Sequence, residues 1–435
     1  MQRLALSSLI EWKNRPTRKP LLIDGPRQCG KTFLVRELFG PKSFKNVHTI
    51  DFRKDQEVHG YFEKNINPNE VLSNLSIYLG QNIDLENDLI FFDEIGECQG
   101  AIDSLKYFCD TYPKAYLCSS GSNIGLLSSF PVGKIETVNL RPMNFYEFLL
   151  ASGEELLIDA FLQRSRVLAV HDKLWDKLLD YYFVGGMPES VAAWFDPHND
   201  DKLTKIKLIE RIQTDLLEGY YRDFGKYSGQ INAMHIEMVF NSIPIQLSKS
   251  MDGSTRRYKF KGVIPNKERY LEMIGPIDWL CKSKLASKCN LIDCEPRPPL
   301  KSLAKENIFK IYMFDIGILG RMLDISYKEH RAQKMIEKGY LAENFVINEL
   351  IARGKTSNYF WKENTSEIEL LIKSTSGEVY PVEVKSGKRT QAKSLRVFNK
   401  KYSPTKSVKL VGKAGGSDEN QIVWPLYFAQ YITDL

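Results

Sequence analysis

A phosphate-binding loop is the clearest chemical feature of this sequence. Residues 25–32 read Gly-Pro-Arg-Gln-Cys-Gly-Lys-Thr and fit the pattern GxxxxGK[ST] in full. In such a loop backbone N–H groups face the phosphates, the lysine reaches the β- and γ-phosphates, and the Ser/Thr hydroxyl binds Mg²⁺. We therefore expect ATP and Mg²⁺ to bind here, with Lys31 as a catalytic cation and Thr32 as a metal ligand. The expected nucleotide contacts are Gly25, Pro26, Arg27, Gln28, Cys29, Gly30, Lys31, Thr32 and Phe33.

Two carboxylates follow a second apolar run. In Leu-Ile-Phe-Phe-Asp-Glu, residues 89–94, a buried strand delivers Asp93 and Glu94 to its carboxyl end. Ligands bind at that edge of open α/β sheets. We expect Asp93 to hold Mg²⁺, directly or through water, and Glu94 to orient or deprotonate the attacking water as a catalytic residue.

Small polar residues end the next predicted strand. The sequence there reads Tyr-Leu-Cys-Ser-Ser-Gly-Ser-Asn over residues 116–123. Ser120 or Asn123 would contact the γ-phosphate or the water, as a sensor of the nucleotide. A plain turn is the alternative interpretation.

The elements around these motifs alternate between strand and helix. An apolar run precedes the glycine loop, and a helical pattern follows it, so the loop joins a strand to a helix. Such alternation predicts an α/β fold with a parallel sheet covered on both faces. We expect strands at 20–24, 47–52, 88–93, 115–119 and 138–140, helices from 147 to about 221, a basic hairpin-like stretch at 254–264, a helix at 340–353, and strands at 358–361, 367–373 and 379–385.

Composition bounds the class of protein. The chain has 435 residues, of which 43% are hydrophobic and 26% charged, values that exclude wholesale disorder. Its longest apolar runs are far shorter than the roughly twenty residues of a membrane-spanning helix, so no membrane partner is expected. The seven cysteines form no CxxC pair, which indicates reduced thiols and a cytoplasmic location.

Positive charge is concentrated in two segments. Residues 251–310 carry 13 Lys/Arg against 7 Asp/Glu, and residues 381–413 carry 10 against one, although the net charge of the chain is only +6. Basic segments on an otherwise acidic chain favour DNA or another polyanion as a partner, with Lys388 and Arg389 as candidate contacts. A solvated lysine-rich surface is the alternative.

The chain resembles a prokaryotic family of AAA-like P-loop ATPases over nearly its whole length. The resemblance rests on LIEWKNRPTRKPLLIDGPRQCGKT, LIFFDEI, SSGSN, LRPMNFYEFL and GGMPE, and towards the end on MFDIGIL, GYLAENFVINEL, EIELLI and YPVEVKSGKR. It implies ATP binding and hydrolysis. It also implies a P-loop domain at 1–146, a helical lid at 147–228, a winged-helix-like module at 229–310 and a C-terminal domain at 311–435.

One departure from the family concerns a charge-stabilising arginine. The family has a Gly-Arg pair after the sensor strand, whereas this chain has Gly133-Lys134. Lysine lacks the planar fork of arginine and is a weaker substitute. Lys134, Arg141 or no residue at all would then supply the cation.

The C-terminal domain also resembles the restriction-endonuclease-like PD-(D/E)xK nuclease fold. The matching residues are Glu343 on a helix, Glu369 on a strand, and Glu383 and Lys385 on the next strand. The resemblance implies a carboxylate site for one or two Mg²⁺ ions, with Lys385 activating water. Glu369 stands where the nuclease pattern prefers Asp, so the alternative is a vestigial site kept as a DNA-binding or docking surface.

The favoured interpretation is an ATPase that couples its nucleotide state to a C-terminal region that binds nucleic acid or a partner protein, or that assembles with further copies of the chain. An ATP-regulated DNA nuclease and a non-hydrolysing ATP-gated switch are the alternatives.

Overall fold

The computed structural model describes residues 1–63, 66–126, 129–199, 201–228, 230–249, 256–332, 339–387, 393–417 and 420–435. They form two compact units, residues 1–141 with 282–284, and residues 142–281 with 285–435. The fold is mixed α/β, as predicted, with a parallel sheet in the first unit and a separate mixed sheet in the second. No helix within these residues is both long and apolar enough to span a membrane.

A parallel five-stranded sheet forms the core of the first unit, in the order β2-β3-β4-β1-β5. Its strands lie where the sequence predicts them. Because all five run the same way, their carboxyl ends meet at one edge, and the loops after them are brought together. The strands are β1 (Leu21–Asp24), β2 (Val47–Asp51), β3 (Leu89–Asp93), β4 (Tyr116–Gly121) and β5 (Glu136–Asn139).

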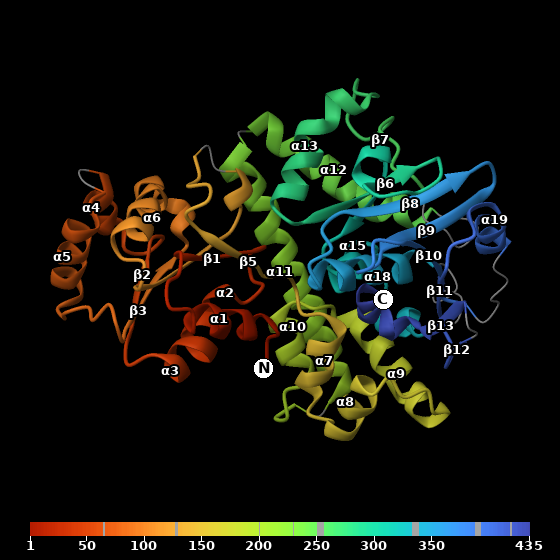
Figure 1. Ribbon diagram of the computed structural model, residues 1–435, viewed down its shortest axis with the longest axis horizontal. Helices are drawn as coiled ribbons and strands as arrows, with labels where there is room; N and C mark the ends of the chain where they lie inside the picture. Colours follow the sequence, from red (N-terminus) through yellow and green to blue (C-terminus); the bar gives the residue numbers. More distant parts are fainter. Residues whose placement is uncertain are drawn as a thin grey trace. The chain divides into compact units, whose positions relative to one another are not determined.

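Helices bury both faces of this sheet, which explains why β1 and β3 are continuous apolar runs. Leu22 and Ile90 face one apolar cluster with α5 (Pro68–Leu79) and α6 (Gln99–Thr111). Leu21 and Leu89, one position away, face the opposite cluster with α1 (Ala5–Lys13) and η1 (Leu34–Phe39). Figure 1 shows α6 and α1 on opposite sides of the sheet. The short elements are α2 (Lys31–Phe33), α3 (Gly40–Ser43), η2 (Gln56–His59), α4 (Gly60–Glu63), η3 (Ile95–Glu97) and η4 (Ile124–Leu126).

The second unit begins with a run of helices, which includes the region predicted to be helical. A capping box formed by Asn144 and Glu147 starts the first of them, because each side chain binds the other residue's backbone N–H. Pro188 occupies the first turn of another, where its missing N–H costs nothing. The helices are α7 (Phe145–Ser152), α8 (Glu155–Leu162), α9 (Leu168–Val184), α10 (Pro188–Trp194), α11 (Lys202–Ser228), α12 (Gln230–Ser248) and α13 (Tyr270–Lys282).

An eight-stranded mixed sheet forms the rest of the second unit, in the order β12-β13-β11-β10-β9-β8-β6-β7. The predicted strands at 358–361, 367–373 and 379–385 are its β8, β9 and β10. The strands are β6 (Ala286–Ile292), β7 (Lys305–Met313), β8 (Asn358–Glu363), β9 (Ser366–Lys373), β10 (Val379–Lys385), β11 (Ser407–Val411), β12 (Gly416–Ser417) and β13 (Gln421–Pro425).

A β-hairpin joins the middle of the chain to this C-terminal sheet. β6 pairs with β7 and also with β8, so the expected boundary between 310 and 311 falls inside β7. The pattern concealed this strand because Lys310 suggests a surface position, whereas it is fully buried. The hairpin-like stretch predicted at 254–264 is wrong for its described part, because residues 256–264 contain no strand and form the isolated bridge of Ile264 with Lys267. Residues 254 and 255 lie outside the described residues. The four-domain division itself stays a prediction.

Two helices pack against the C-terminal sheet. α18 (Tyr340–Ala352) is almost entirely buried, and its buried residues include the polar side chains of Glu343, Asn344 and Glu349. α19 (Lys393–Tyr402) buries Leu395 and Phe398 against Trp361 of β8 and Ile368 of β9. The remaining elements are α14 (Leu300–Leu303), α15 (Ile316–Met322), α16 (Tyr327–His330) and η5 (Leu426–Asp434).

Candidate functional site

The phosphate loop leaves the carboxyl end of β1 and enters α2. Gly30 has φ of 89°, a left-handed conformation that favours glycine, and Gln28 has φ of 61°. Gly25 is confined differently, because a Cβ atom there would collide with the carbonyl oxygen of Leu140. Both glycines of the motif are therefore required by the path of the loop.

Lys31 extends back across the loop that it follows. Its Nζ donates to the carbonyl oxygens of Gly25 at 3.1 Å and Pro26 at 2.9 Å, and to Ser122 Oγ at 2.8 Å. Lys31 is only 5% exposed. All three acceptors are neutral. These hydrogen bonds therefore hold the ammonium group of Lys31 beside the loop without neutralising its positive charge.

Thr32 and Asp93 meet at the carboxyl ends of β1 and β3. Thr32 Oγ1 donates to Asp93 Oδ2 at 2.8 Å, and Ser120 Oγ donates to Asp93 Oδ1. A hydroxyl and a carboxylate beside a phosphate loop are the hard oxygen ligands that Mg²⁺ takes together with substrate phosphates. The two predicted metal ligands are thus adjacent and fit Mg²⁺.

Glu94 turns the chain sharply after β3. Its φ is 50°, an uncommon value for a residue with a long side chain, and it precedes η3. Backbone strain of this kind costs on the order of 1–3 kcal/mol and gathers at functional sites. Glu94 is half-buried at the same sheet edge as Lys31 and Asp93, consistent with its predicted position.

The two predicted sensor residues differ in their surroundings. Ser120 contacts Asp93 rather than facing the loop, and Asn123 is half-buried with φ of 62°. The residue that reaches Lys31 is Ser122, which the sequence interpretation missed. Ser122 follows the last residue of β4 and belongs to the same Ser-Ser-Gly-Ser-Asn stretch as Ser120 and Asn123, so the small polar residues of that stretch were the available signal.

The two candidate cations lie at opposite ends of β5. Lys134 precedes β5 and pairs with Asp110 at 2.5 Å, at the amino edge of the sheet. Arg141 follows β5 at the carboxyl edge, and its carbonyl oxygen accepts a hydrogen bond from Arg3. Because Arg3 also donates to the carbonyl oxygen of Cys29 at 2.7 Å, Arg141 is the candidate that lies beside the phosphate loop.

The remaining predicted nucleotide contacts differ in exposure. Cys29 and Pro26 are buried, Arg27 is half-buried and Gln28 is exposed. Phe33, 41% exposed, is an apolar ring at the start of the helix and is free of the sheet core. In the same compact unit, Lys284 forms an ion pair with Asp24, the residue that precedes the loop.

The C-terminal candidates also come together, around a lysine. Lys385 Nζ lies 3.2 Å from Glu369 Oε1 and 3.5 Å from Glu383 Oε1, across the antiparallel pair β9–β10. Burial raises the pKa of Glu369 to about 7, and burial also raises the pKa of Glu383. Burial by itself lowers the pKa of Lys385. The nearby carboxylates of Glu369 and Glu383 have the larger combined effect, so the pKa of Lys385 is raised.

A second buried lysine, absent from the sequence interpretation, occupies the other side of this cluster. Lys310 Nζ lies 3.1 Å from Glu343 Oε2 and 2.7 Å from Glu367 Oε1. Tyr312 donates to the same oxygen of Glu343 at 2.8 Å. Although burial opposes the charge of Lys310, the carboxylates hold its pKa well above the ordinary value. Glu343 is thus neutralised by a different lysine from the one that neutralises Glu369 and Glu383.

These residues do not fit the metal site that the nuclease resemblance implies. Two ammonium groups already occupy the centre of the carboxylate cluster. Among the residues that the structure describes, no group of three or more His, Cys, Asp or Glu side chains is arranged to hold a metal ion. Lys388 and Arg389, the candidate nucleic-acid contacts, lie outside the described residues.

Sequence profiles of known families match three parts of the chain. An AAA domain matches residues 17–149, and two domains of unknown function, DUF8612 and DUF4143, match residues 176–329 and 338–429. None of the curated proteins compared with the chain matches it. The first match contains the whole loop, Asp93 and Glu94, and supports an AAA-like P-loop nucleotide-binding domain. The descriptions of the other two families name no function.

Proposed function

We propose that this protein is a Mg²⁺-dependent ATPase whose nucleotide state controls a C-terminal region that binds nucleic acid or a partner protein. The observation that carries the ATPase is the arrangement at one sheet edge of Lys31, Thr32, Asp93 and Glu94. Charges of both signs lie there beside a loop shaped for phosphates. An AAA domain match over the same residues supports the proposal.

Each side chain has a distinct role in this proposal. Lys31 exchanges its neutral loop acceptors for the β- and γ-phosphates, a short movement of an already oriented ammonium group. Thr32 and Asp93 would hold Mg²⁺, which neutralises phosphate charge when bound. Glu94 orients the attacking water and accepts its proton as the bond between the γ-phosphorus and the bridging oxygen breaks. Ser122 positions Lys31 from the neighbouring strand.

Arg141 is the better candidate for the charge-stabilising cation. Its backbone is tied to the phosphate loop through Arg3, whereas Lys134 lies at the opposite sheet edge with Asp110. A guanidinium also offers the planar fork that suits phosphate oxygens. We therefore assign the role to Arg141 rather than to Lys134.

The proposal for the C-terminal region rests on charge. Lys409 of β11 pairs in register with Glu383, and the charges of Lys413, Lys385 and Arg396 act on it. This concentration of cations beside β10 and β11 suits a polyanion such as DNA, since phosphate binding requires charge and not cleavage. The proposal also allows a partner protein, or a further copy of this chain, to bind the C-terminal region in place of a nucleic acid.

ATP turnover measured with and without a panel of DNA and RNA forms tests the proposal. We expect Mg²⁺-dependent hydrolysis that is lost in Lys31→Ala and altered by the nucleic acid that binds. Tight ATP binding without turnover would replace the ATPase with a non-hydrolysing switch. Turnover that no nucleic acid changes would favour a protein partner.

A further inference from the structure

A pocket lies in the first unit, at the sheet edge opposite the phosphate loop. The segment 15–19 leads into β1, Pro113 precedes β4, and Ile135 and Glu136 lie at the start of β5. Because these strands are parallel, the pocket lies at their amino ends, whereas the phosphate loop follows the carboxyl end of β1. The pocket has a volume of about 460 Å³, within the range of small-molecule sites.

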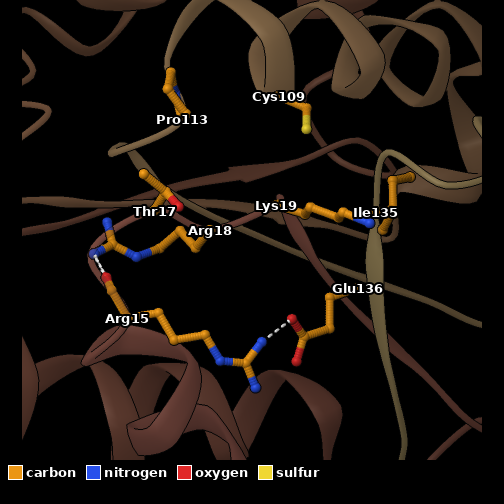
Figure 2. Close-up of a pocket in the computed structure, with 8 residues that line it drawn as sticks. All are labelled: Arg15, Thr17, Arg18, Lys19, Cys109, Pro113, Ile135 and Glu136. Carbon is orange, nitrogen blue, oxygen red and sulfur yellow. Dashed lines mark hydrogen bonds and ion pairs between the residues drawn. The ribbon is translucent and has the colours of Figure 1, made fainter.

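Cations dominate the lining of this pocket. Arg15, Arg18 and Lys19 contribute three positive charges against the one carboxylate of Glu136 (Figure 2). Burial raises the pKa of the Cys109 thiol on the pocket wall, and the charges of Lys134 and Lys19 act in the opposite direction. The ammonium groups of Lys134 and Lys19 are therefore close enough to Cys109 to affect its pKa. The residues that line the pocket carry an excess of positive charge.

Arg18 is held in place before any ligand arrives. Its guanidinium donates to the carbonyl oxygens of Arg15 and Lys114, and lies 4.1 Å from the ring centroid of Tyr116. Its Nε is buried and has no hydrogen-bond partner among the described residues. A fixed guanidinium loses little conformational freedom when it binds an anion. Arg18 is thus a guanidinium held in a fixed position on the pocket wall.

The carboxylate of Glu136 binds the guanidinium of Arg15, as a phosphate group would. The two side chains form an ion pair (Figure 2). Glu11 is a further partner of Arg15, at 3.4 Å. The side chains of Arg15 and Glu136 are 41% and 30% exposed, so water screens the pair and it can be exchanged. An incoming anion therefore competes with Glu136 for Arg15.

We propose that this pocket binds a compact phosphorylated small molecule through Arg15, Arg18 and Lys19, with Glu136 as the internal competitor. Planar guanidinium groups bind phosphate oxygens in pairs, and the pocket is of a size for one small ligand rather than for a duplex. This site is separate from the ATP site and goes beyond the proposed ATPase. A terminal phosphate of a nucleic acid strand offers the same chemistry and is distinguished by the experiment.

Calorimetric titration of the full chain with inorganic pyrophosphate tests the proposal. The chain carries Lys31→Ala throughout, which removes the main phosphate contact of the other site. We expect Arg18→Gln and Lys19→Gln each to weaken binding about tenfold, the scale of a lost charge-assisted hydrogen bond. Glu136→Gln should strengthen binding several-fold, because it removes the competitor. Lys106→Gln, an exposed charge outside the pocket, is the matched control and should change nothing.

The variants are expected to change the affinity for pyrophosphate in opposite directions, which keeps the test decisive. Arg18→Gln can destabilise the unit through its lost backbone contacts, so each variant is also followed by thermal unfolding. Glu136→Gln is expected to raise the affinity, a change that partial unfolding does not produce. Pyrophosphate binding that is equal in all variants, or equally weakened by Lys106→Gln, would overturn the proposal. Loss of binding of a 5′-phosphorylated oligonucleotide in Arg18→Gln, with no pyrophosphate binding in any chain, would reassign the pocket to nucleic acid.

Discussion

The phosphate loop and the C-terminal acidic cluster use the same residue types in opposite ways. Among the residues that the structure describes, Lys31 donates to carbonyl and hydroxyl oxygens, and the carboxylate of Asp93 accepts from the hydroxyl groups of Thr32 and Ser120. Lys310 and Lys385 instead lie directly against glutamates. Charge at the loop is therefore positioned and still available to a ligand, whereas charge in the cluster is already neutralised within the protein.

This difference separates a binding site from an internal ion-pair network. A lysine and several carboxylates at motif spacing occur in both places, so residue type alone does not decide the chemistry. The chemistry is decided by whether the nearest partner of each charged group is neutral or carries the opposite charge. The predictions below test this contrast, in order of decreasing expected effect.

Replacing Glu94 should lower turnover strongly while leaving ATP binding in place. We expect Glu94→Gln to bind ATP and to lower hydrolysis by roughly 10²-fold or more, the usual scale for a lost general base. Steady-state ATPase rates and nucleotide affinity measure the two effects. Glu97→Gln, three residues along in η3, is the control and should retain turnover. Normal turnover in Glu94→Gln would remove this residue from the mechanism.

Removing Lys310 should destabilise the second unit strongly. Lys310→Met leaves buried carboxylates without their counter-charge, a change that costs about 3–5 kcal/mol. Denaturant unfolding followed by the fluorescence of the chain measures the effect. Lys362, 49% exposed, also pairs with Glu367, and Lys362→Met should cost less than about 1 kcal/mol. Equal losses in the two variants would contradict a buried network.

Nuclease activity should be absent in Mg²⁺. Because lysines occupy the carboxylate cluster, we expect no efficient cleavage of supercoiled or linear DNA, with or without ATP, and at most weak cleavage in the more permissive Mn²⁺. Cleavage in Mg²⁺ that Glu383→Ala abolishes would contradict this and favour the nuclease alternative.

DNA binding should be separable from Glu383. We expect binding to persist in Glu383→Ala and to fall when Lys388 and Arg389 are both neutralised. If about five phosphates are contacted, log affinity should fall against log salt with a slope near −4.5. Binding that does not change between low and high salt would exclude a phosphate-dominated contact.

The smallest expected effect is on the pH dependence of stability. Burial raises the folded-state pKa of Glu369 to about 7, so the native state holds this proton more tightly than the unfolded chain. The associated stability is fully present below the ordinary glutamate pKa and is lost as pH rises towards 7. Glu369→Gln should flatten this part of the stability profile, measured by unfolding at several pH values. A steeper profile in the variant would contradict the assignment.

The sequence by itself determined the phosphate loop, the acidic end of β3 and the positions of the strands around them. Each of these features is local, because one glycine loop or one apolar run contains all the residues that define it. Glu383 and Lys385 are two positions apart on β10, so alternation along the strand places them on one face. The contact of Lys385 with Glu369 of β9 depends in addition on how the strands pair.

Only the tertiary structure decided which charges meet. Ser122 reaches Lys31, Lys310 enters the glutamate cluster, and Arg141 rather than Lys134 lies by the phosphate loop. Each of these contacts joins strands or loops that are distant in the chain, and strand order fixes them. A lysine in a strand pattern suggests solvent exposure, because the sequence does not show the buried carboxylates that make its burial favourable.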